Sequence, residues 1–418
     1  MDREKLLKEG VKEKFLRYVS YDTQADEKSE DVPSSPGQMR LALRLRDELV
    51  AMGLTDAAVK DGCIVTATYE GPRREAPVIG FIAHMDTAPG VPGNGVKPII
   101  HRDYSGGDLI LPAGIVLSPD TSKDLTGAKG HTIITSDGTT LLGADDKAGV
   151  AEIMEALCRL VFSSPADCGR VKVAFTSDEE IGRGITRFDV ASFGAEAAYT
   201  LDGGIAGELE DENFNASNLT AVIRGVSAHP GKARGRMINA IHLASELTAA
   251  IPAVMRPETT DGRLGFVHPT SLCGDIERVE LEIIVRDFEE EGLARSLAMV
   301  RGVAEDIMRR HPGSFIELSD RGGYKNMKQF ISAAPKVSSL AVEAIRRAGM
   351  NPVTRSIRGG TDGAHLAVRG LPTPNLFTGG SDFHSRTEWV SVQWMEKAVD
   401  VICGLCALWS KELSVSLD

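Results

Sequence analysis

The sequence predicts an α/β fold, in which helices flank a mostly parallel sheet and a smaller second domain is inserted into the chain. Between residues 148 and 201, short apolar strands alternate with helical patterns, which is the βαβ rhythm of a parallel sheet. After Glu212 the strands alternate apolar and polar residues instead, so one of their faces is polar. In addition, His, Asp or Glu residues directly follow several apolar runs. Ligands bind beyond the carboxyl ends of such strands, so these residues predict one shared site.

Hydrophobic periodicity places the elements of the main domain. Amphipathic helices are predicted at 4–18 and at 38–52, the second ending at Gly53 in a C-cap position. Further strands are predicted at 63–69, 78–83, 171–176 and 197–201, and further helices at 148–161 and 185–193. Residues 89–129 are rich in Gly, Pro and Asp, which predicts a long excursion with a few short strands.

The inserted domain is predicted at 213–323, between a first part of the main domain at 1–212 and a second part at 324–418. Its predicted strand, helix, strand, strand, helix and strand lie at 219–226, 238–250, 264–271, 279–287, 290–310 and 315–319. This βαββαβ order is typical of a ferredoxin-like domain. The chain then returns with a helix at 336–348, a strand at 374–378 and a closing helical pattern at 394–413.

Composition and charge exclude several classes of protein. The 418 residues are too many for one ordinary core, so two domains are expected. The 59 acidic and 47 basic residues give a net charge of −12, which argues against nucleic acid and anionic membranes as partners. Because neither a signal peptide nor a run of about 18 apolar residues is found, we expect a cytoplasmic location. Cys403 and Cys406 lie in a helical pattern without a second Cys or His pair nearby, so we expect them to pack in the core.

The stretch around Asp145 and Asp146 combines an apolar pair, a glycine, two carboxylates and the start of a helical pattern. One interpretation is that an aspartate caps this helix, since Asp is a favoured N-cap residue. The other is a cation site, because four further apolar runs also lead into residues of the ligand type. These residues are His84 with Asp86, Glu179 with Glu180, Asp202, and Asp382 with His384.

Two imidazoles and three carboxylates form a mixed nitrogen and oxygen ligand set without thiolate, which suits zinc, or cobalt or manganese. The candidate ligands are His84, Asp145, Glu180, Asp202 and His384. If Asp145 bridges two divalent ions, each ion has one His, the shared Asp and one further carboxylate. Such a dinuclear centre activates water and polarises a carbonyl. Asp86 is then placed to accept the second N–H of His84, and Glu179 remains as the general base.

Seven motifs carry a resemblance that covers almost the whole chain. They are 84–87 (HMDT), 141–152 (LLGADDKAGVAE), 175–184 (FTSDEEIGRG), 202–204 (DGG), 212–216 (ENFNA), 228–233 (AHPGKA) and 357–364 (IRGGTDGA). In these motifs the chain resembles the aminotripeptidase branch of the M20 family of dinuclear zinc metallopeptidases. The resemblance implies a zinc-peptidase-like catalytic domain, with 213–323 as a lid and dimerisation domain. It also implies a cytoplasmic homodimer that releases the N-terminal residue from tripeptides.

The resemblance further implies a role for each site residue. The residues implied to hold one zinc ion are His84, Asp145 and Asp202, and those implied to hold the other are Asp145, Glu180 and His384. The implied catalytic residues are Asp86 and Glu179. A cis peptide bond is implied between Asp145 and Asp146.

Three further residues are candidates for binding the substrate. Arg286 ends a strand of the inserted domain and Arg358 opens a glycine-rich loop, so the two could hold the C-terminal carboxylate of a short peptide. The alternative for each is a surface salt bridge. His229, at the end of the first inserted strand, is predicted to donate to the oxyanion formed at the partner's metals in a homodimer. The alternative is a turn histidine, since His-Pro-Gly also favours a turn.

Three functions are compatible with these residues. The leading one is a zinc aminopeptidase that acts on tripeptides. The second is another amide hydrolase of the same scaffold, namely a deacylase, dipeptidase or carboxypeptidase, because a fold does not determine its substrate. The third is an inactive binding protein. The ENFNA motif argues against the second, and the presence of Glu179 with a full ligand set argues against the third. A serine hydrolase is not expected, because no G-x-S-x-G motif occurs.

Overall fold

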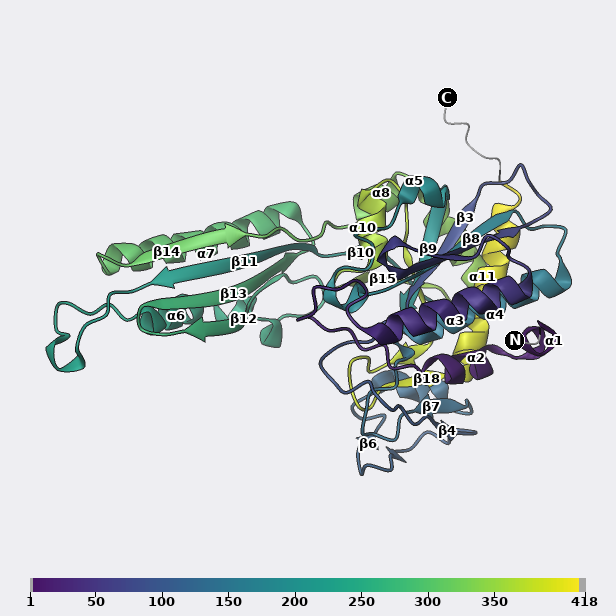
Figure 1. Ribbon diagram of the computed structural model, residues 1–418, viewed down its shortest axis with the longest axis horizontal. Helices are drawn as coiled ribbons and strands as arrows, with labels where there is room; N and C mark the ends of the chain where they lie inside the picture. Colours follow the sequence, from purple (N-terminus) through teal and green to yellow (C-terminus); the bar gives the residue numbers. More distant parts are fainter. Residues whose placement is uncertain (1–2, 413–418) are drawn as a thin grey trace. The chain divides into compact units, whose positions relative to one another are not determined.

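The computed structural model describes residues 3–412, and these residues divide into two units (Figure 1). The first unit contains the chain up to Asp211, the segment Met327–Ser356 and the chain from Thr361 onward. The second unit contains Glu212–Asn326 and Ile357–Gly360. The second unit is therefore an insertion into the sequence of the first.

The first unit is built on an eight-stranded sheet with the order β1-β2-β8-β3-β9-β16-β10-β15. Its strands are β1 (Ala58–Lys60), β2 (Ile64–Glu70), β3 (Ile79–His84), β8 (Arg170–Thr176), β9 (Ala197–Gly203), β10 (Glu208–Asn213), β15 (Val353–Ile357) and β16 (Asn375–Phe377). The four central strands β8, β3, β9 and β16 are parallel, whereas β1, β2 and β10 pair antiparallel with their neighbours. The sheet is therefore mixed with a parallel centre, which confirms the predicted α/β class.

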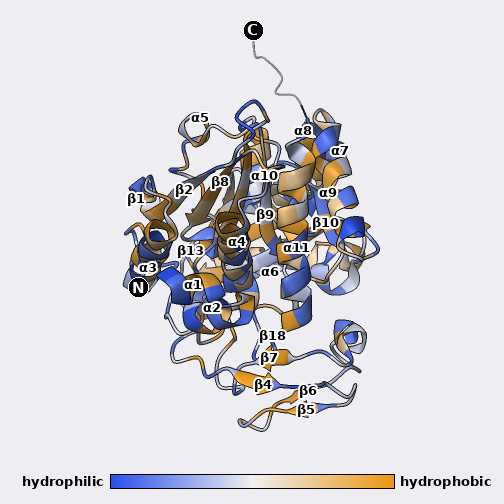
Figure 2. Cartoon of the chain, turned by 90° about the vertical axis from the view of Figure 1, so that its right-hand side faces the viewer, coloured by the Kyte–Doolittle hydropathy of each residue, from blue (hydrophilic) through white to orange (hydrophobic). Residues whose placement is uncertain are grey.

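Helices cover both faces of this sheet, and the strands are accordingly apolar on both sides. Every residue of β3 is buried. Phe81 of β3 packs into a large core with α3, α4, α9 and α11, whereas its neighbour Ile82 packs on the opposite face with Phe193 and Leu366. Figure 2 shows the hydrophobic residues gathered along β2, β8 and β9. Burial on both faces explains why these strands have continuous apolar sequences.

The helices of the first unit agree with the predicted helices where the hydrophobic periodicity extends over many residues. They are α1 (Arg3–Lys8), α2 (Val11–Tyr18), α3 (Pro36–Met52), α4 (Ala144–Ser163), α5 (Val190–Phe193), α8 (Lys328–Ser332), α9 (Pro335–Arg347), α10 (Asp362–Val368) and α11 (Val392–Trp409). Gly53 caps α3 with φ of 107°, as predicted. The closing helix ends at Trp409, and the last residue of its predicted range, 413, lies outside the described residues. No helix between residues 3 and 412 combines the length and apolar character needed to cross a membrane.

Three differences from the predicted elements have identifiable causes, of which two are local. The predicted helix 4–18 is broken into α1 and α2, because Gly10 is the N-cap of a new helix. The predicted helix 185–193 shrinks to α5, because the side chain of Asp189 accepts the N–H of Ser192 and starts the helix there. Strand β10 was not predicted, since its sequence Glu-Leu-Glu-Asp-Glu-Asn is acidic; its pairing with β16 forms it instead.

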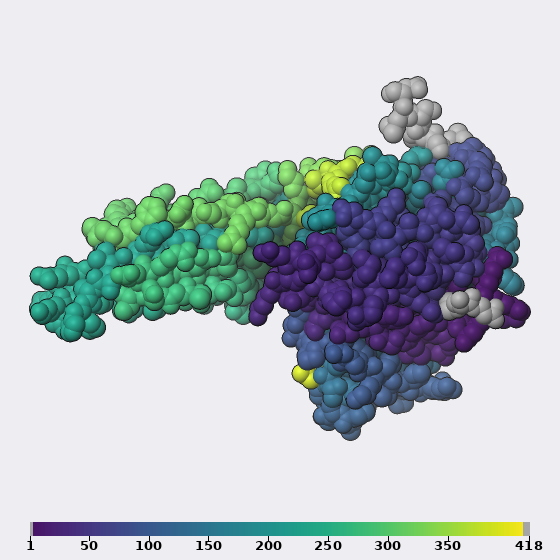
Figure 3. Space-filling view, viewed as in Figure 1, coloured from purple at the N-terminus to yellow at the C-terminus, as the bar shows by residue number. Residues whose placement is uncertain are grey.

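A smaller part of the first unit brings two distant stretches side by side. It contains a sheet with the order β17-β18-β7-β4 and the hairpin β5-β6. The strands are β4 (Ile99–His101), β5 (Leu109–Ile110), β6 (Val116–Leu117), β7 (Ile133–Thr135), β17 (Gly380–Ser381) and β18 (Trp389–Ser391). Figure 3 shows the excursion around residue 100, in blue, projecting from this unit. Val390 of β18 pairs with Ile134 of β7, so the loop after β17 approaches the loop before α4.

The second unit has the predicted βαββαβ element order. Its elements are β11 (Asn215–Arg224), α6 (Ala240–Ala249), β12 (Phe266–Gly274), β13 (Arg278–Asp287), α7 (Glu290–Arg310) and β14 (Phe315–Asp320). The strands form an antiparallel sheet with the order β12-β13-β11-β14. Leu281 and Ile283 of β13 are buried with Leu243 of α6 and Val300 of α7 in one core. The alternation seen in the sequence therefore marks the face that the two helices cover.

Helix α4 buries one carboxyl group that lacks a hydrogen bond. Glu152 is 0% exposed, and neither of its side-chain oxygens has a hydrogen-bond partner among the described residues. Burial raises the pKa of Glu152 well above its ordinary value. The folded chain therefore favours the protonated form of this carboxyl more than the unfolded chain does, in which the group releases its proton above about pH 4.3.

The folded chain binds this proton more tightly than the unfolded chain does. The contribution of Glu152 to the free energy of unfolding therefore falls as the pH rises above about 5, by up to about 1.4 kcal/mol per pH unit. Glu152→Gln keeps the shape and removes the titration. We expect the thermal midpoint of the variant to rise relative to wild type between pH 5 and pH 8, measured by calorimetry without metal. Glu396→Gln, at an exposed position of α11, controls for the lost charge. A difference independent of pH would contradict this account.

Candidate metal centre

Five predicted ligands meet beyond the carboxyl ends of the parallel strands of the first unit. His84 ends β3, Asp202 lies near the end of β9, Glu180 follows β8 in a 3-10 turn, Asp145 starts α4, and His384 lies between β17 and β18. This is the edge of the sheet at which a shared site was predicted. The topology therefore gathers residues that are up to 300 positions apart in the sequence.

The ligands form two groups that share one carboxylate. One group is His84, Asp145 and Asp202, the other is Asp145, Glu180 and His384, and the ligand atoms of each group lie within 4.8 Å of one another. The Nε2 atom of His84 is 2.9 Å from Oδ1 of Asp145, and Nε2 of His384 is 3.0 Å from Oδ2. Asp145 thus presents one oxygen to each group, which is the arrangement of a bridging ligand.

The donor set suits two divalent cations. The first group has one imidazole and two carboxylates, and so does the second. Oε1 of Glu180 lies 2.9 Å from Nε2 of His384, yet it is buried without an aligned hydrogen-bond donor. A buried carboxylate oxygen in this state is costly unless a cation meets it. A set of nitrogen and oxygen ligands without sulfur is appropriate for zinc, cobalt or manganese.

Asp86 supports this centre through the backbone as well as through His84. Its carboxylate is 0% exposed and accepts the N–H groups of Glu179 and Glu180, both at 3.1 Å. The predicted approach to His84 is present, with 3.4 Å between Oδ1 and Nδ1, but it is not an aligned hydrogen bond. The contacts of Asp86 with the turn after β8 were not predicted from the sequence.

The two interpretations of the doubled aspartate apply to different residues. Asp145 faces the imidazoles, as a ligand would. Asp146 is fully buried, and its carboxylate accepts the N–H groups of His84 at 3.0 Å and Gly149 at 3.2 Å. It therefore ties the end of β3 to the first turn of α4, as a capping residue would. The peptide bond between the two aspartates is cis, as predicted.

The comparison with known proteins gives this centre a family. Residues 137–407 match the model of peptidase family M20/M25/M40. Peptidase T of Geobacillus kaustophilus is 45% identical over 411 residues, which cover 98% of this chain and 100% of that protein. The chain belongs to the M20 peptidases, in the peptidase T branch. The predicted family is therefore confirmed.

Two solved structures show the same fold at lower identity. Aminopeptidase PepT of Bacillus cereus superposes with a TM-score of 0.75 at 23% identity, covering 96% of this chain and 98% of that one. A dinuclear metal-binding peptidase of the M20 family from Bacillus subtilis superposes with a TM-score of 0.61 at 17% identity, covering 95% and 98%. The fold is thus shared over nearly the full length of each chain.

Without ions, protonated imidazoles balance the carboxylates of this M20 centre. Burial alone would lower the pKa of His84, but Asp202 and Asp145 raise it well above its ordinary value. The nearby carboxylates of Asp145 and Glu180 raise the pKa of His384 to about 11. Burial acts to raise the pKa of Asp145, but its hydrogen bonds with His384 and His84 outweigh burial and lower it. Divalent ions must therefore displace protons from the imidazoles, so their affinity falls as the pH falls.

Glu179 lies on a turn whose shape is set by other side chains. The preceding residue, Asp178, has φ of 58°, and its carboxylate accepts the N–H of Ser34 at 2.8 Å and the Nε2 amide of Gln38 at 2.6 Å. Burial raises the pKa of Glu179 well above its ordinary value, and Asp202 adds to the effect. A carboxylate with a raised pKa suits a general base that later returns the proton.

Two buried acids near the centre were missed by the sequence analysis. Asp362, in the first turn of α10, accepts the hydroxyl hydrogen of Thr176 at 2.7 Å, and burial raises the pKa of its carboxyl to about 6. Glu388 accepts backbone N–H groups from the loop before α4. Neither directly follows an apolar run, which was the signal that identified the candidate ligands. The position of Glu388, four residues after a ligand in the same loop, could have suggested it.

The three predicted substrate-binding residues belong to the second unit. Arg286 stacks on Tyr324 with 4.7 Å between guanidinium carbon and ring centroid, and its Nη1 is buried without a hydrogen-bond partner among the described residues. Arg358 donates from Nη1 to the carbonyl oxygens of Gly262 at 2.8 Å and Leu264 at 2.9 Å. His229 is exposed, and its Nδ1 accepts the N–H of Gly231 at 3.2 Å. The alternative interpretation of a surface salt bridge therefore fits neither arginine.

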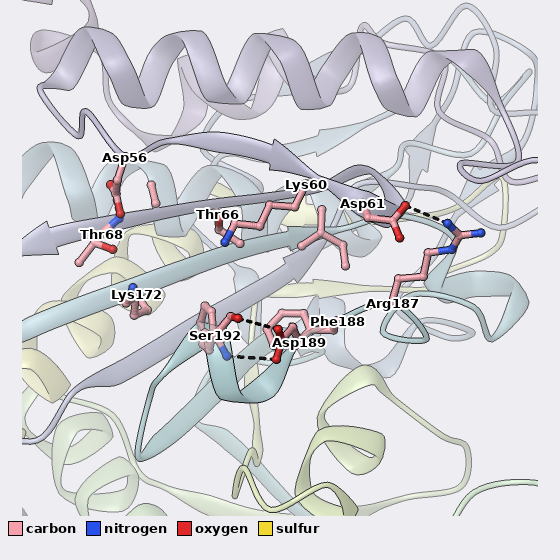
Figure 4. A pocket seen from close by; sticks show the side chains of 13 residues that line it. Asp56, Lys60, Asp61, Thr66, Thr68, Lys172, Arg187, Phe188, Asp189 and Ser192 are labelled. Atoms are coloured by element: carbon pink, nitrogen blue, oxygen red, sulfur yellow. Dashed lines mark hydrogen bonds and ion pairs between the residues drawn. The ribbon is translucent and has the colours of Figure 1, made fainter.

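A separate cavity of about 350 Å³ lies between β1, β2, β8 and α5 (Figure 4). Its walls include Lys60, Lys172 and Phe188, and the ion pair of Asp61 with Arg187 at 2.8 Å lies at its edge. None of the predicted ligands lines this cavity. It is therefore distinct from the metal centre.

The geometry separates ligands from the general base. Asp145→Ala removes the carboxylate shared by both groups, so we expect it to lose both ions together with activity. Glu179→Gln keeps every ligand, so we expect about two ions per chain and a fall in kcat of about 10²–10⁴-fold. Metal analysis of dialysed protein alongside peptide hydrolysis measures both effects. Loss of metal from Glu179→Gln would mean that Glu179, rather than Glu180, is a ligand.

Proposed function

We propose that this chain is a dinuclear zinc aminopeptidase that releases the N-terminal residue from tripeptides, and that it works as a homodimer in the cytoplasm. The observation that carries the proposal is the carboxylate of Asp145, which faces two ligand groups at once. Its support from relatives is the 45% identity to a protein named peptidase T across nearly the whole chain. Cobalt or manganese could replace zinc in the same ligand set.

The proposed mechanism assigns each residue one task. One ion would be held by His84 and Asp202, and the other by Glu180 and His384. Asp145 would bind both ions. Two zinc ions there would supply an activated water and polarise the scissile carbonyl. Glu179 takes the proton of the attacking water and passes it to the leaving amine. Asp86 keeps the Glu179 turn in place through its two backbone hydrogen bonds.

Recognition of a short peptide needs a group for its C-terminal carboxylate. Of the two predicted arginines, Arg286 is the stronger candidate, because its Nη1 is buried and has no hydrogen-bond partner in the described part of the chain. Stacking on Tyr324 keeps the guanidinium plane in one orientation. Arg358 is committed to the carbonyl oxygens of Gly262 and Leu264. We propose that Arg286 binds the carboxylate directly and that Arg358 contributes mainly by ordering its surroundings.

The proposed homodimer uses the second unit as its lid and dimerisation domain; the strand order of this unit is ferredoxin-like. Strand β12 is an edge strand, and the exposed side chains along it include Leu272 at 49%. On α6, Ile241 is also exposed, at 39%. An exposed edge with apolar side chains is suited to pairing with a second copy about a two-fold axis.

His229 has the hydrogen-bonding state that its proposed role requires. Its Nδ1 accepts a backbone N–H, so in the neutral ring the hydrogen is on Nε2. The exposed Nε2–H is then free to donate to the oxyanion of the tetrahedral intermediate. We propose that it does so at the metal centre of the partner subunit.

A panel of free and blocked di-, tri- and tetrapeptides tests the proposed activity. We expect free tripeptides to lose their N-terminal residue fastest and N-acetylated tripeptides to be resistant, with products identified by mass spectrometry. Hydrolysis of acylated amino acids, or release of the C-terminal residue, would indicate a deacylase or a carboxypeptidase instead.

The carboxylate clamp is tested with a tripeptide and its C-terminal amide. Wild type should prefer the free acid, and Arg286→Ala should lose that preference through a higher KM for the acid alone, because only the acid gains from the guanidinium. Arg278→Ala, at the other end of β13 and paired with Glu280, is the matched control and should keep it. An unchanged ratio of kcat/KM values in Arg286→Ala would refute the clamp.

The role of His229 is tested by subunit complementation. His229→Ala should lower activity about 10²–10³-fold, the usual cost of one oxyanion donor. Mixed and exchanged with inactive Glu179→Gln, it should yield heterodimers with one intact site and activity up to about a quarter of wild type, if equal amounts assort at random. Heterodimers without activity would show that His229 does not act on its partner.

A further inference from the structure

The carboxylate of Glu388 organises the turn that carries the bridging aspartate. Its Oε2 accepts the N–H groups of Leu142 at 2.7 Å and Gly143 at 2.8 Å, and its Oε1 accepts that of Asp145 at 3.0 Å. Glu388 is 1% exposed, so these hydrogen bonds are shielded from water. Three aligned donors on one buried carboxylate hold both the position and the orientation of the turn.

The turn cannot supply this support from its own residues. Gly143 is the N-cap of α4, has φ of 82° and provides no side-chain cap. A Cβ atom added there would lie 3.3 Å from Cγ2 of Thr87, and the left-handed backbone further favours glycine. A capping side chain must therefore come from elsewhere. Glu388, about 245 residues further along the chain, fills that role.

The same loop carries a ligand and the support of another ligand. His384 and Glu388 lie four residues apart between β17 and β18. One contacts the carboxylate of Asp145 at 3.0 Å, and the other contacts its backbone N–H at 3.0 Å. Between them, Thr387 donates its N–H to Oγ of Ser385 at 3.1 Å, which stiffens the loop. A shift of this loop would therefore move His384 and Asp145, two of the three ligands of the second group, together.

A buried lysine acts electrostatically on this carboxylate. Lys147, in the first turns of α4, is 1% exposed, and Asp22, Glu388 and Asp86 favour its charged form against the effect of burial. Its Nζ donates to the carbonyl oxygen of Tyr21 at 2.9 Å, which keeps the ammonium in place. The two carboxylates that hold ligand-bearing turns by their backbone thus share one lysine.

We infer that Glu388 is a positioning residue of the metal centre, which holds Asp145 where its two oxygens can face two ions. The inference rests on the proposed dinuclear centre. It differs from a purely structural role, in which Glu388 caps α4 and stabilises the fold without affecting the ions. The two roles predict different metal affinities.

The test compares Glu388→Gln with wild type and with Glu48→Gln. Glu48 is a matched control, because it is 0% exposed and accepts hydrogen bonds from Tyr18 and Arg17 on α2. The amide of Glu388→Gln places a donor against backbone N–H groups and so disrupts the turn. We expect its affinity for Zn²⁺ and Co²⁺, measured by chelator competition, to fall about 10–100-fold. The visible spectrum of bound Co²⁺ should also change.

Kinetic measurements should also distinguish a positioning role of Glu388 from a purely structural role. In Glu388→Gln, excess metal should recover most of kcat with KM for a free tripeptide nearly unchanged, whereas Glu179→Gln should not recover. Glu48→Gln should lower the thermal midpoint without altering metal affinity. Wild-type affinity and an unchanged Co²⁺ spectrum in Glu388→Gln would overturn the inference and leave Glu388 as a helix cap. Fewer than two ions in wild type would instead refute the dinuclear centre, and the affinity ratio would still test Glu388.

If Glu388→Gln does not fold, Glu388→Asp gives the same comparison. It keeps the charge but withdraws the carboxylate by one methylene group, so it cannot reach all three donors. We expect its metal affinity to fall as well. Wild-type affinity in this variant would overturn the inference, because the charge alone would then suffice.

Discussion

The structure depends on the burial of several carboxylates at one edge of a parallel sheet. Asp86, Asp145, Glu179, Glu180 and Asp202 gather there with only two imidazoles among the candidate ligands. Carboxylates at such short distances cannot all remain ionised unless cations or hydrogen-bond donors compensate them. The carboxylates raise the pKa values of both histidines, which reflects the need for positive charge at this site. A pair of divalent ions would meet it, which is why we propose a metal centre at this edge of the sheet.

Four buried acids around the ligands accept backbone N–H groups. Asp86 accepts two from the turn after β8, and Asp146 accepts two from the end of β3 and the start of α4. Glu388 accepts two from the loop before α4 and one from the first turn of α4. Asp178 accepts one from Ser34. Every turn that presents a ligand is thereby tied to another part of the first unit. This arrangement holds the ligands in place before any ion binds.

The second unit contributes chemistry of a different kind. Its sheet is antiparallel and its helices cover one face, so one edge and part of its surface remain exposed. Stacking of Arg286 on Tyr324 and of Arg358 on Phe214 places two guanidinium groups on aromatic rings in this unit. Of these two arginines, only Arg286 has a buried donor without a hydrogen-bond partner among residues 3–412. The two arginines, equivalent in the sequence analysis, therefore differ in what they can bind.

The sequence by itself determined the α/β class, the long helices such as α4 and α7, the order of the inserted elements and the ligands at strand ends. These features have local signals, because hydrophobic periodicity and ligand residues after apolar runs are visible within about ten residues. The tertiary structure decided the rest. The acidic strand β10, the backbone contacts of Asp86 and the support of Asp145 by Glu388 depend on partners far away in the chain. Hydrogen bonds between distant segments exist only once the sheet has brought them together, so no local pattern could reveal them.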